Sequence, residues 1–225
     1  MKRTKLKDRR LPDYTRGEEI MNFVSHIVGG GIGIVVFLLC LWRAIINPDG
    51  WKIAGSIIYG ISFIQLYTIS SVYHALRPGT GKKVLQIIDH CAIYFFIAGT
   101  YTPICLIALQ GAGGTSLFLL VWGVALLGII QCIFFINCPK WVSSLLYIAM
   151  GWLCIFNFGN IVELLNTTAF YWLLAGGIIY TIGGIIYACK FPVFNHLHKN
   201  FGSHEIFHCF VLAGSMCHFV TMYCI

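Results

Sequence analysis

The chain has 225 residues, of which 58% are hydrophobic and only 10% carry a formal charge, against roughly 25% charged residues in an ordinary soluble domain. With a mean hydropathy of +0.81, this composition excludes a soluble globular protein as well as the collagen-like, disordered and coiled-coil classes. Seven membrane helices of about 20 residues occupy roughly 140 residues and leave only short loops, so we predict one polytopic membrane domain.

Seven apolar stretches are long enough to cross a bilayer, and they predict an all-α seven-helix bundle. In chain order they cover residues 20–42, 53–73, 84–109, 116–136, 141–162, 170–189 and 206–225. We expect a basic tail over residues 1–18 and the membrane domain over residues 19–225. Glycine-rich runs at 29–33 and 176–184 predict close helix packing, since small residues let neighbouring backbones approach each other in lipid.

The basic residues predict the orientation of the bundle. Of the 15 Lys and Arg residues, only Arg43 and Lys52 fall on the side opposite to the N-terminus. The positive-inside rule therefore predicts a cytoplasmic N-terminus and, after seven crossings, an outside C-terminus. The basic tail is expected to set this topology, with binding of anionic lipid head groups as an alternative role. The net charge of +7 requires no nucleic-acid partner.

Polar and ionisable residues in or beside the predicted spans are few, and they collect at one level of the bundle. Such groups are costly in lipid, so each one is a functional candidate unless a neighbour satisfies it. In the predicted orientation, four helices have them near their cytoplasmic ends. These residues are Glu19, Asn22 and His26 in the first span, Ser70 and His74 in the second, Asp89 and His90 in the third, and His204, Glu205 and His208 in the seventh.

The histidines of this group predict a zinc site. His204 and His208 are four residues apart, so they project from one helix face with the spacing that two imidazoles need to bind one tetrahedral Zn²⁺. His74 supplies a third nitrogen, and three protein ligands with an open fourth position are typical of a catalytic zinc. We expect Asp89 to be a general base or a hydrogen-bond acceptor for the metal's water. Ser70, one turn before His74, is expected to bond the substrate oxygen or support a ligand.

The other histidines and Glu19 are expected to be structural. For His26, His90 and His218 we favour hydrogen bonding inside the bundle over metal binding. Glu19 is expected to mark the start of a helix, where its charge meets the positive end of the helix dipole. We assign no role to the two histidines of the loop after the sixth span, His196 and His198.

Residues 204–208 also fit H-E-x-x-H, the pattern in which the intervening glutamate is the general base of a metalloprotease. The extended form of the motif needs a histidine at position 214, where this chain has Gly214, and no acidic residue follows Glu205. Any third ligand must therefore lie upstream. The motif strengthens the zinc pair and leaves an intramembrane protease as a minor alternative.

Four ordered motifs resemble the hemolysin III family of bacterial membrane proteins, within the progestin and adiponectin Q receptor (PAQR) superfamily. They are EIMNFVSH at 19–26, SSVYH at 70–74, DHCAIYFFIAGTYTP at 89–103, and residues 203–208 followed by 210–218. The resemblance implies a seven-helix bundle with zinc held by His74, His204 and His208. It also implies that Asp89 lies near the metal's water, with Ser70 beside it. Relatives in the wider superfamily, together with the alkaline ceramidases, look like zinc-dependent amide hydrolases that act on lipids, and members of this branch carry a cytolytic label.

Three functions remain open from the sequence. The leading hypothesis is a zinc-dependent hydrolase in the bacterial plasma membrane, with a lipid-like amide or ester as substrate. The alternatives are a pore-forming cytolysin and a zinc-containing membrane receptor or sensor. The sequence does not determine the substrate or the oligomeric state.

Overall fold

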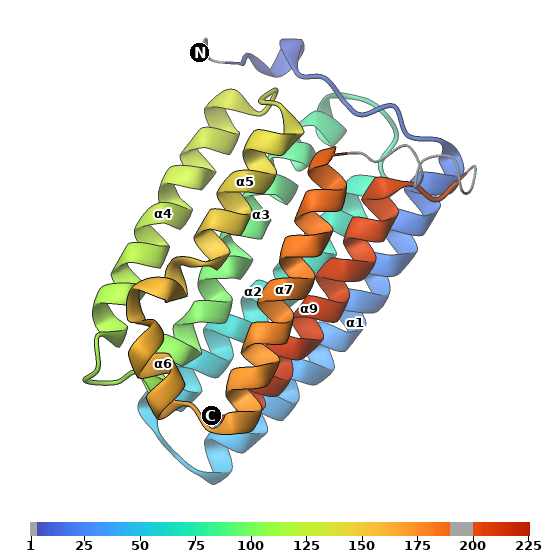
Figure 1. The fold of residues 1–225 in the computed structure, drawn as a ribbon. Coiled ribbons are helices and arrows are strands. Elements are labelled where there is room, and N and C mark those ends of the chain that lie inside the picture. Colours follow the sequence, from blue (N-terminus) through green and yellow to red (C-terminus); the bar gives the residue numbers. More distant parts are fainter. Residues whose placement is uncertain (1–3, 190–199) are drawn as a thin grey trace.

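A computed structural model describes residues 4–189 and 200–225 of the protein, and within these residues the chain is helical without strands. Seven helical segments are long and apolar enough to cross a membrane, which confirms the predicted fold class. The two ends of the chain lie at opposite ends of the bundle (Figure 1), as an odd number of crossings requires. The helices are α1 (Arg16–Ile46), α2 (Gly50–Ala75), α3 (Thr80–Pro103), α4 (Gly114–Phe135), α5 (Lys140–Gly151), α6 (Phe158–Leu164), α7 (Thr167–Cys189) and α9 (Ser203–Cys224).

Local capping fixes where the first two helices begin. Thr15 and Glu18 form a reciprocal capping box at the start of α1, and the Asp49 side chain accepts hydrogen bonds from two backbone N–H groups at the start of α2. Helix α1 therefore begins inside the tail predicted for residues 1–18. The loop that holds His196 and His198 lies outside the described residues.

The helices form a ring with one helix outside it. Helix α1 packs against α2 and α9, α2 packs against α3, and α7 packs against both α9 and α5, while α4 packs on the outer side of α3. Outward faces carry exposed apolar side chains such as Leu38, Leu127 and Phe156, as surfaces in contact with lipid should. Of the candidate functional residues described below, Asp89, His204 and His208 line a cavity between these helices.

Glycines bring helices together as predicted. A Cβ atom at Gly33 would lie 2.6 Å from the Phe63 ring, and one at Gly183 would lie 2.6 Å from Phe210. The first contact joins α1 to α2 and the second joins α7 to α9. Small residues are therefore required where these helices touch.

The third and fifth predicted spans are not continuous α-helices. After Pro103, α3 continues as one π-helical turn, and after Gly151 the fifth span passes through a 3₁₀ segment before α6. The Tyr101 hydroxyl donates a 2.5 Å hydrogen bond to the Gly151 carbonyl and accepts a 2.9 Å bond from the Cys154 N–H. It thereby satisfies backbone groups that the break would leave unpaired in the membrane.

The segment before α1 crosses the end of the bundle that the charge distribution assigns to the cytoplasm. The Thr4 N–H donates to the Phe134 carbonyl at 2.7 Å, and the Arg9 guanidinium donates to the Ile133 carbonyl at 2.7 Å. Both acceptors lie in the last turn of α4. The described part of the predicted basic tail is therefore packed onto the bundle.

Candidate metal centre

Three histidines converge at the end of the bundle that the charge distribution assigns to the cytoplasm. His74 lies in the last turn of α2, and His204 and His208 lie in the first two turns of α9, so two helices that end and begin at the same level bring them together. One ring nitrogen of each lies within 4.8 Å of one nitrogen of each of the others. His74 and His208 are each only 3% exposed. The three residues predicted as metal ligands therefore form one cluster.

The distances and donor types of this cluster fit zinc. Ligands of a tetrahedral zinc with bonds of about 2.0–2.1 Å lie roughly 3.3–3.4 Å apart. The Nε2 atoms of His74 and His204 are separated by 3.4 Å, which matches this edge. The longest distance between two ligand nitrogens of the cluster is at most 4.8 Å. One ring would therefore rotate slightly inward for all three nitrogens to reach one zinc ion. Three imidazoles also correspond to the donor set of a site that keeps one coordination position open.

A carboxylate orients the first of these ligands. His74 Nδ1 lies 2.7 Å from Glu19 Oε2, and Lys82 Nζ donates to Glu19 Oε1 at 2.5 Å. A carboxylate on Nδ1 fixes the imidazole tautomer and leaves the Nε2 lone pair for a metal. Glu19 therefore supports the cluster through its contact with His74. The sequence predicted only that Glu19 marks the start of a helix, and did not predict this contact.

His26 and His90 differ in how their rings are held. The His26 ring stacks on His208 with 3.6 Å between centroids and meets Tyr67 edge-on, and neither of its buried nitrogens has a hydrogen-bond partner among the described residues. The expectation of a hydrogen-bonded His26 is therefore wrong, because ring packing holds it instead. His90 follows the expectation, since its Nδ1 lies 2.8 Å from the Gln86 carbonyl one turn earlier.

Glu205 has a structural role in this arrangement. Its Oε1 accepts a 2.6 Å bond from the Asn22 amide, and its Oε2 accepts a 2.7 Å bond from the Gly202 N–H. The side chain is 3% exposed. Both carboxylate oxygens are thus used to cap α9 and to join it to α1, which argues against Glu205 as a protease base.

Asp89 and Ser70 lie near the cluster, along the same cavity. Both line it together with His204 and His208. Asp89 Oδ2 lies 3.8 Å from His90 Nδ1, which is too long for a hydrogen bond. The two residues predicted to act beside the metal are therefore brought to the same part of the fold as its candidate ligands.

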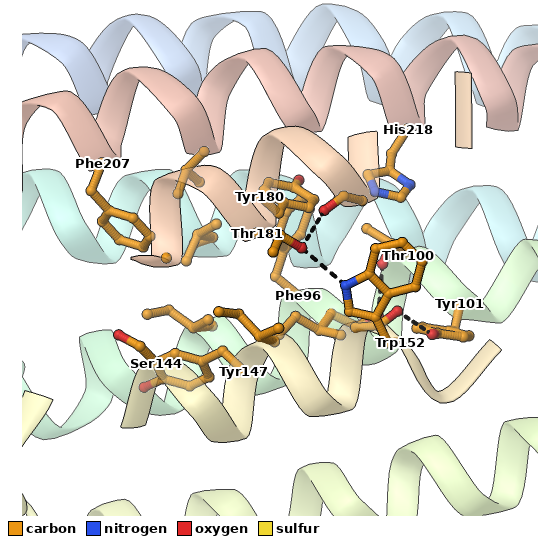
Figure 2. A pocket seen from close by; sticks show the side chains of 18 of the residues that line it. Phe96, Thr100, Tyr101, Ser144, Tyr147, Trp152, Tyr180, Thr181, Phe207 and His218 are labelled. Atoms are coloured by element: carbon orange, nitrogen blue, oxygen red, sulfur yellow. Dashed lines mark hydrogen bonds between the residues drawn. The ribbon is translucent and has the colours of Figure 1, made fainter. Parts of the chain in front are cut away.

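The cavity runs from the histidines toward the opposite end of the bundle and has a volume of about 170 Å³. Helices α3, α5, α7 and α9 supply most of its wall, and its lining is mainly apolar and aromatic. Figure 2 shows its middle part, where Phe96, Tyr147 and Phe207 face the same space as several hydroxyl groups. A hydrocarbon chain is the kind of ligand that such walls accommodate.

Tyr14, just before α1, covers the cluster. Its ring stacks on His204 with 5.1 Å between centroids, and its hydroxyl lies 3.5 Å from Lys140 Nζ. Burial raises the pKa of the Tyr14 phenol well above its usual range, and nearby phenols and carboxylates act in the same direction. The phenol therefore stays neutral at physiological pH.

Sequence reasoning missed the supporting roles of Glu19 and Tyr14. The spacing of Glu19, Asn22 and His26 already indicated one polar face on α1. The partners of that face lie on α2, α3 and α9, however, and nothing in the spacing identifies them.

Comparison with known proteins identifies the family. The family model described as "Haemolysin-III related" matches residues 14–219, a range that contains the three clustered histidines and Asp89. The chain is 37% identical over 214 residues to the Bacillus subtilis "Hemolysin-3 homolog" (94% of this chain, 97% of the relative). It is 37% identical over 198 residues to the Bacillus cereus "Hemolysin-3" (88% and 87%). A more distant relative is the Homo sapiens "Monocyte to macrophage differentiation factor", 26% identical over 190 residues (79% and 73%). The chain therefore belongs to the haemolysin-III related family of multi-pass membrane proteins.

Proposed function

We propose that this protein is a zinc-dependent hydrolase of the bacterial plasma membrane that cleaves an amide or ester bond in a lipid-like substrate. The observation that carries the proposal is the convergence of three imidazoles, two of which, those of His204 and His208, line a cavity with mainly apolar walls. The Bacillus relatives support the bacterial membrane as the location.

The ligand set is His74, His204 and His208. A zinc ion on these nitrogens would lower the pKa of a water molecule to about 7 and polarise a substrate carbonyl. Glu19 holds His74 in the tautomer that keeps Nε2 free of a proton.

Two further residues supply proton transfer and orientation. The Asp89 carboxylate, 9% exposed, accepts the proton of the attacking water and returns it to the leaving group. Ser70, which lines the same cavity, orients that carboxylate toward the reacting atoms. The apolar walls hold the hydrocarbon part of the substrate and exclude bulk water from the reaction.

A second candidate function is membrane lysis, which the names of the two Bacillus relatives suggest. A pore needs a polar lining through the whole thickness of the membrane. The lining of the cavity is mainly apolar and aromatic, which favours a hydrolase. Release of a trapped dye from liposomes that persists after zinc is chelated would favour lysis.

The test combines metal analysis with turnover. Purified protein is assayed for zinc by elemental analysis and for cleavage of a panel of lipid amides and esters. We expect His208→Ala to lose both zinc and turnover, whereas His90→Ala, at the same level but outside the ligand set, keeps its zinc. Full zinc content in His208→Ala would refute the ligand assignment, and zinc binding without cleavage of any lipid amide or ester would refute the hydrolase.

A further inference from the structure

A second set of polar side chains lines the cavity far from the metal centre. We call it the distal polar cluster. From His208 to His218 the axis of α9 advances about 15 Å, so the two sets are well separated. In Figure 2 the cluster lies to the right, with Ser144 and Tyr147 toward the left. Its members are Thr100, Trp152, Tyr180, Thr181 and His218.

Most of these groups have hydrogen-bond partners within the protein. The Trp152 indole N–H donates to Thr181 Oγ1 at 2.9 Å, and the Thr181 hydroxyl donates to the Gly177 carbonyl at 2.7 Å. Since the Ser215 hydroxyl donates its hydrogen to a backbone carbonyl, the Tyr180 hydroxyl, 2.9 Å away, is the donor in their contact. These bonds fix the positions of the cluster without needing a ligand.

His218 is the exception. Its ring stacks on Tyr180 with 5.2 Å between centroids, and its Nδ1 is buried without a hydrogen-bond partner among the described residues. The facing helix is shaped for this ring, because a Cβ atom at Gly176 would lie 2.9 Å from His218 Nε2. A buried polar atom left unpaired is unfavourable, so an imidazole held in this position calls for a partner.

We propose that the distal polar cluster binds a hydroxyl group in the middle of the substrate's hydrocarbon chain, with His218 as its main contact. Either tautomer of the ring can serve, because a hydroxyl both donates and accepts. The wall between the two polar sets is largely apolar, with Ile93, Phe96, Ile97 and Val211 along it. A ligand that reaches both sets must therefore be apolar between two polar groups.

The spacing determines where the hydroxyl lies. An extended chain advances about 3.6 Å for every three bonds, so 15 Å corresponds to roughly twelve bonds. This position of the hydroxyl rests on the proposed function, because it assumes that the reacting head group lies at the metal centre. The predicted substrate class is a lipid whose acyl chain is hydroxylated near its twelfth carbon.

The test uses hydroxylated fatty acids as probes. Competition against tritium-labelled stearic acid is measured for 12-hydroxystearic acid and for its isomer hydroxylated at carbon 6, too far from the carboxylate to chelate the metal, with zinc-loaded protein in one detergent. We expect the first isomer to bind about two- to tenfold more tightly than the second, the effect of one neutral hydrogen bond. Equal affinities of the two isomers would overturn the proposal.

Two variants test the contact itself. His218→Phe keeps an aromatic ring but removes its nitrogens, so the isomer preference should disappear while binding of stearic acid stays. The matched control is Tyr147→Phe, which removes a hydroxyl of the same cavity that already donates to the His90 carbonyl and should keep the preference. A preference that survives in His218→Phe would refute the role of this residue. If His218→Phe fails to fold, a series of acids hydroxylated at successive carbons on the unmodified protein decides, because a flat series refutes the site.

A zinc-stripped sample separates this proposal from the proposed function. If the head group lies at the metal, zinc removal weakens binding of both isomers and reduces their difference. Unchanged affinities with the isomer preference intact would refute the metal anchor and leave the distal site standing.

Discussion

Replacing Glu19 by Gln tests whether the candidate metal centre depends on its supporting carboxylate. The substitution keeps the size of the side chain but removes the charge that faces His74 Nδ1 at 2.7 Å and Lys82 Nζ at 2.5 Å. His74 and Lys82 are each 3% exposed, so solvent cannot replace the lost carboxylate. The tautomer and the orientation of the imidazole become less fixed.

The expected loss is 10- to 100-fold in zinc affinity, the usual range for a carboxylate that orients a ligating histidine. This corresponds to about 1.4–2.7 kcal/mol of binding free energy. The upper part of the range is favoured because the His74 side chain itself has no exposed surface.

Zinc affinity is measured by competition with a fluorescent zinc chelator on detergent-purified protein. The matched control is Glu18→Gln, which changes the neighbouring carboxylate. Glu18 contacts the Thr15 backbone in the capping box and does not contact the cluster. An affinity of Glu19→Gln within twofold of the native protein would refute the supporting role of Glu19.

A double variant separates the two partners of Glu19. If the loss of zinc affinity in Glu19→Gln arises from an unpaired Lys82 ammonium, then combining Glu19→Gln with Lys82→Met restores zinc binding. If it arises from the lost contact to His74, the double variant stays as weak as the single one. The second outcome is expected, because only His74 belongs to the cluster.

Three further substitutions test the other assignments. Asp89→Asn should lower turnover by about 10²- to 10⁴-fold without releasing zinc, since it removes the proton acceptor alone; retained activity would exclude Asp89 as the base. Glu205→Ala should lower the stability by roughly 1–3 kcal/mol in a thermal melt, because the Asn22 amide loses its buried acceptor, while zinc stays bound. A fall in turnover without a fall in stability would instead revive Glu205 as a protease base. Tyr101→Phe leaves two backbone groups unpaired at the break after α5 and should lower the melting temperature, with no change in zinc content by elemental analysis.

The sequence predicted the seven crossings because every membrane span must bury about 20 residues of apolar length in lipid. It also predicted the triad of His74, His204 and His208, because ionisable groups are so rare at membrane depth that each can be considered singly. The break after Gly151 was missed, since hydropathy does not distinguish a continuous helix from an interrupted one. The interruption depends on Tyr101 of another helix, whose hydroxyl donates to the Gly151 carbonyl.

By itself, the sequence determined which segments enter the membrane, which end of the bundle gathers the polar residues, and which histidines share one helix face. These properties depend on composition and on spacing within a helix. Only the tertiary structure decided that Glu19 orients His74, that Glu205 joins α9 to α1, and that His218 Nδ1 has no hydrogen-bond partner among the described residues. Each of these contacts joins residues from different helices, and packing in three dimensions, not spacing along the chain, brings them together.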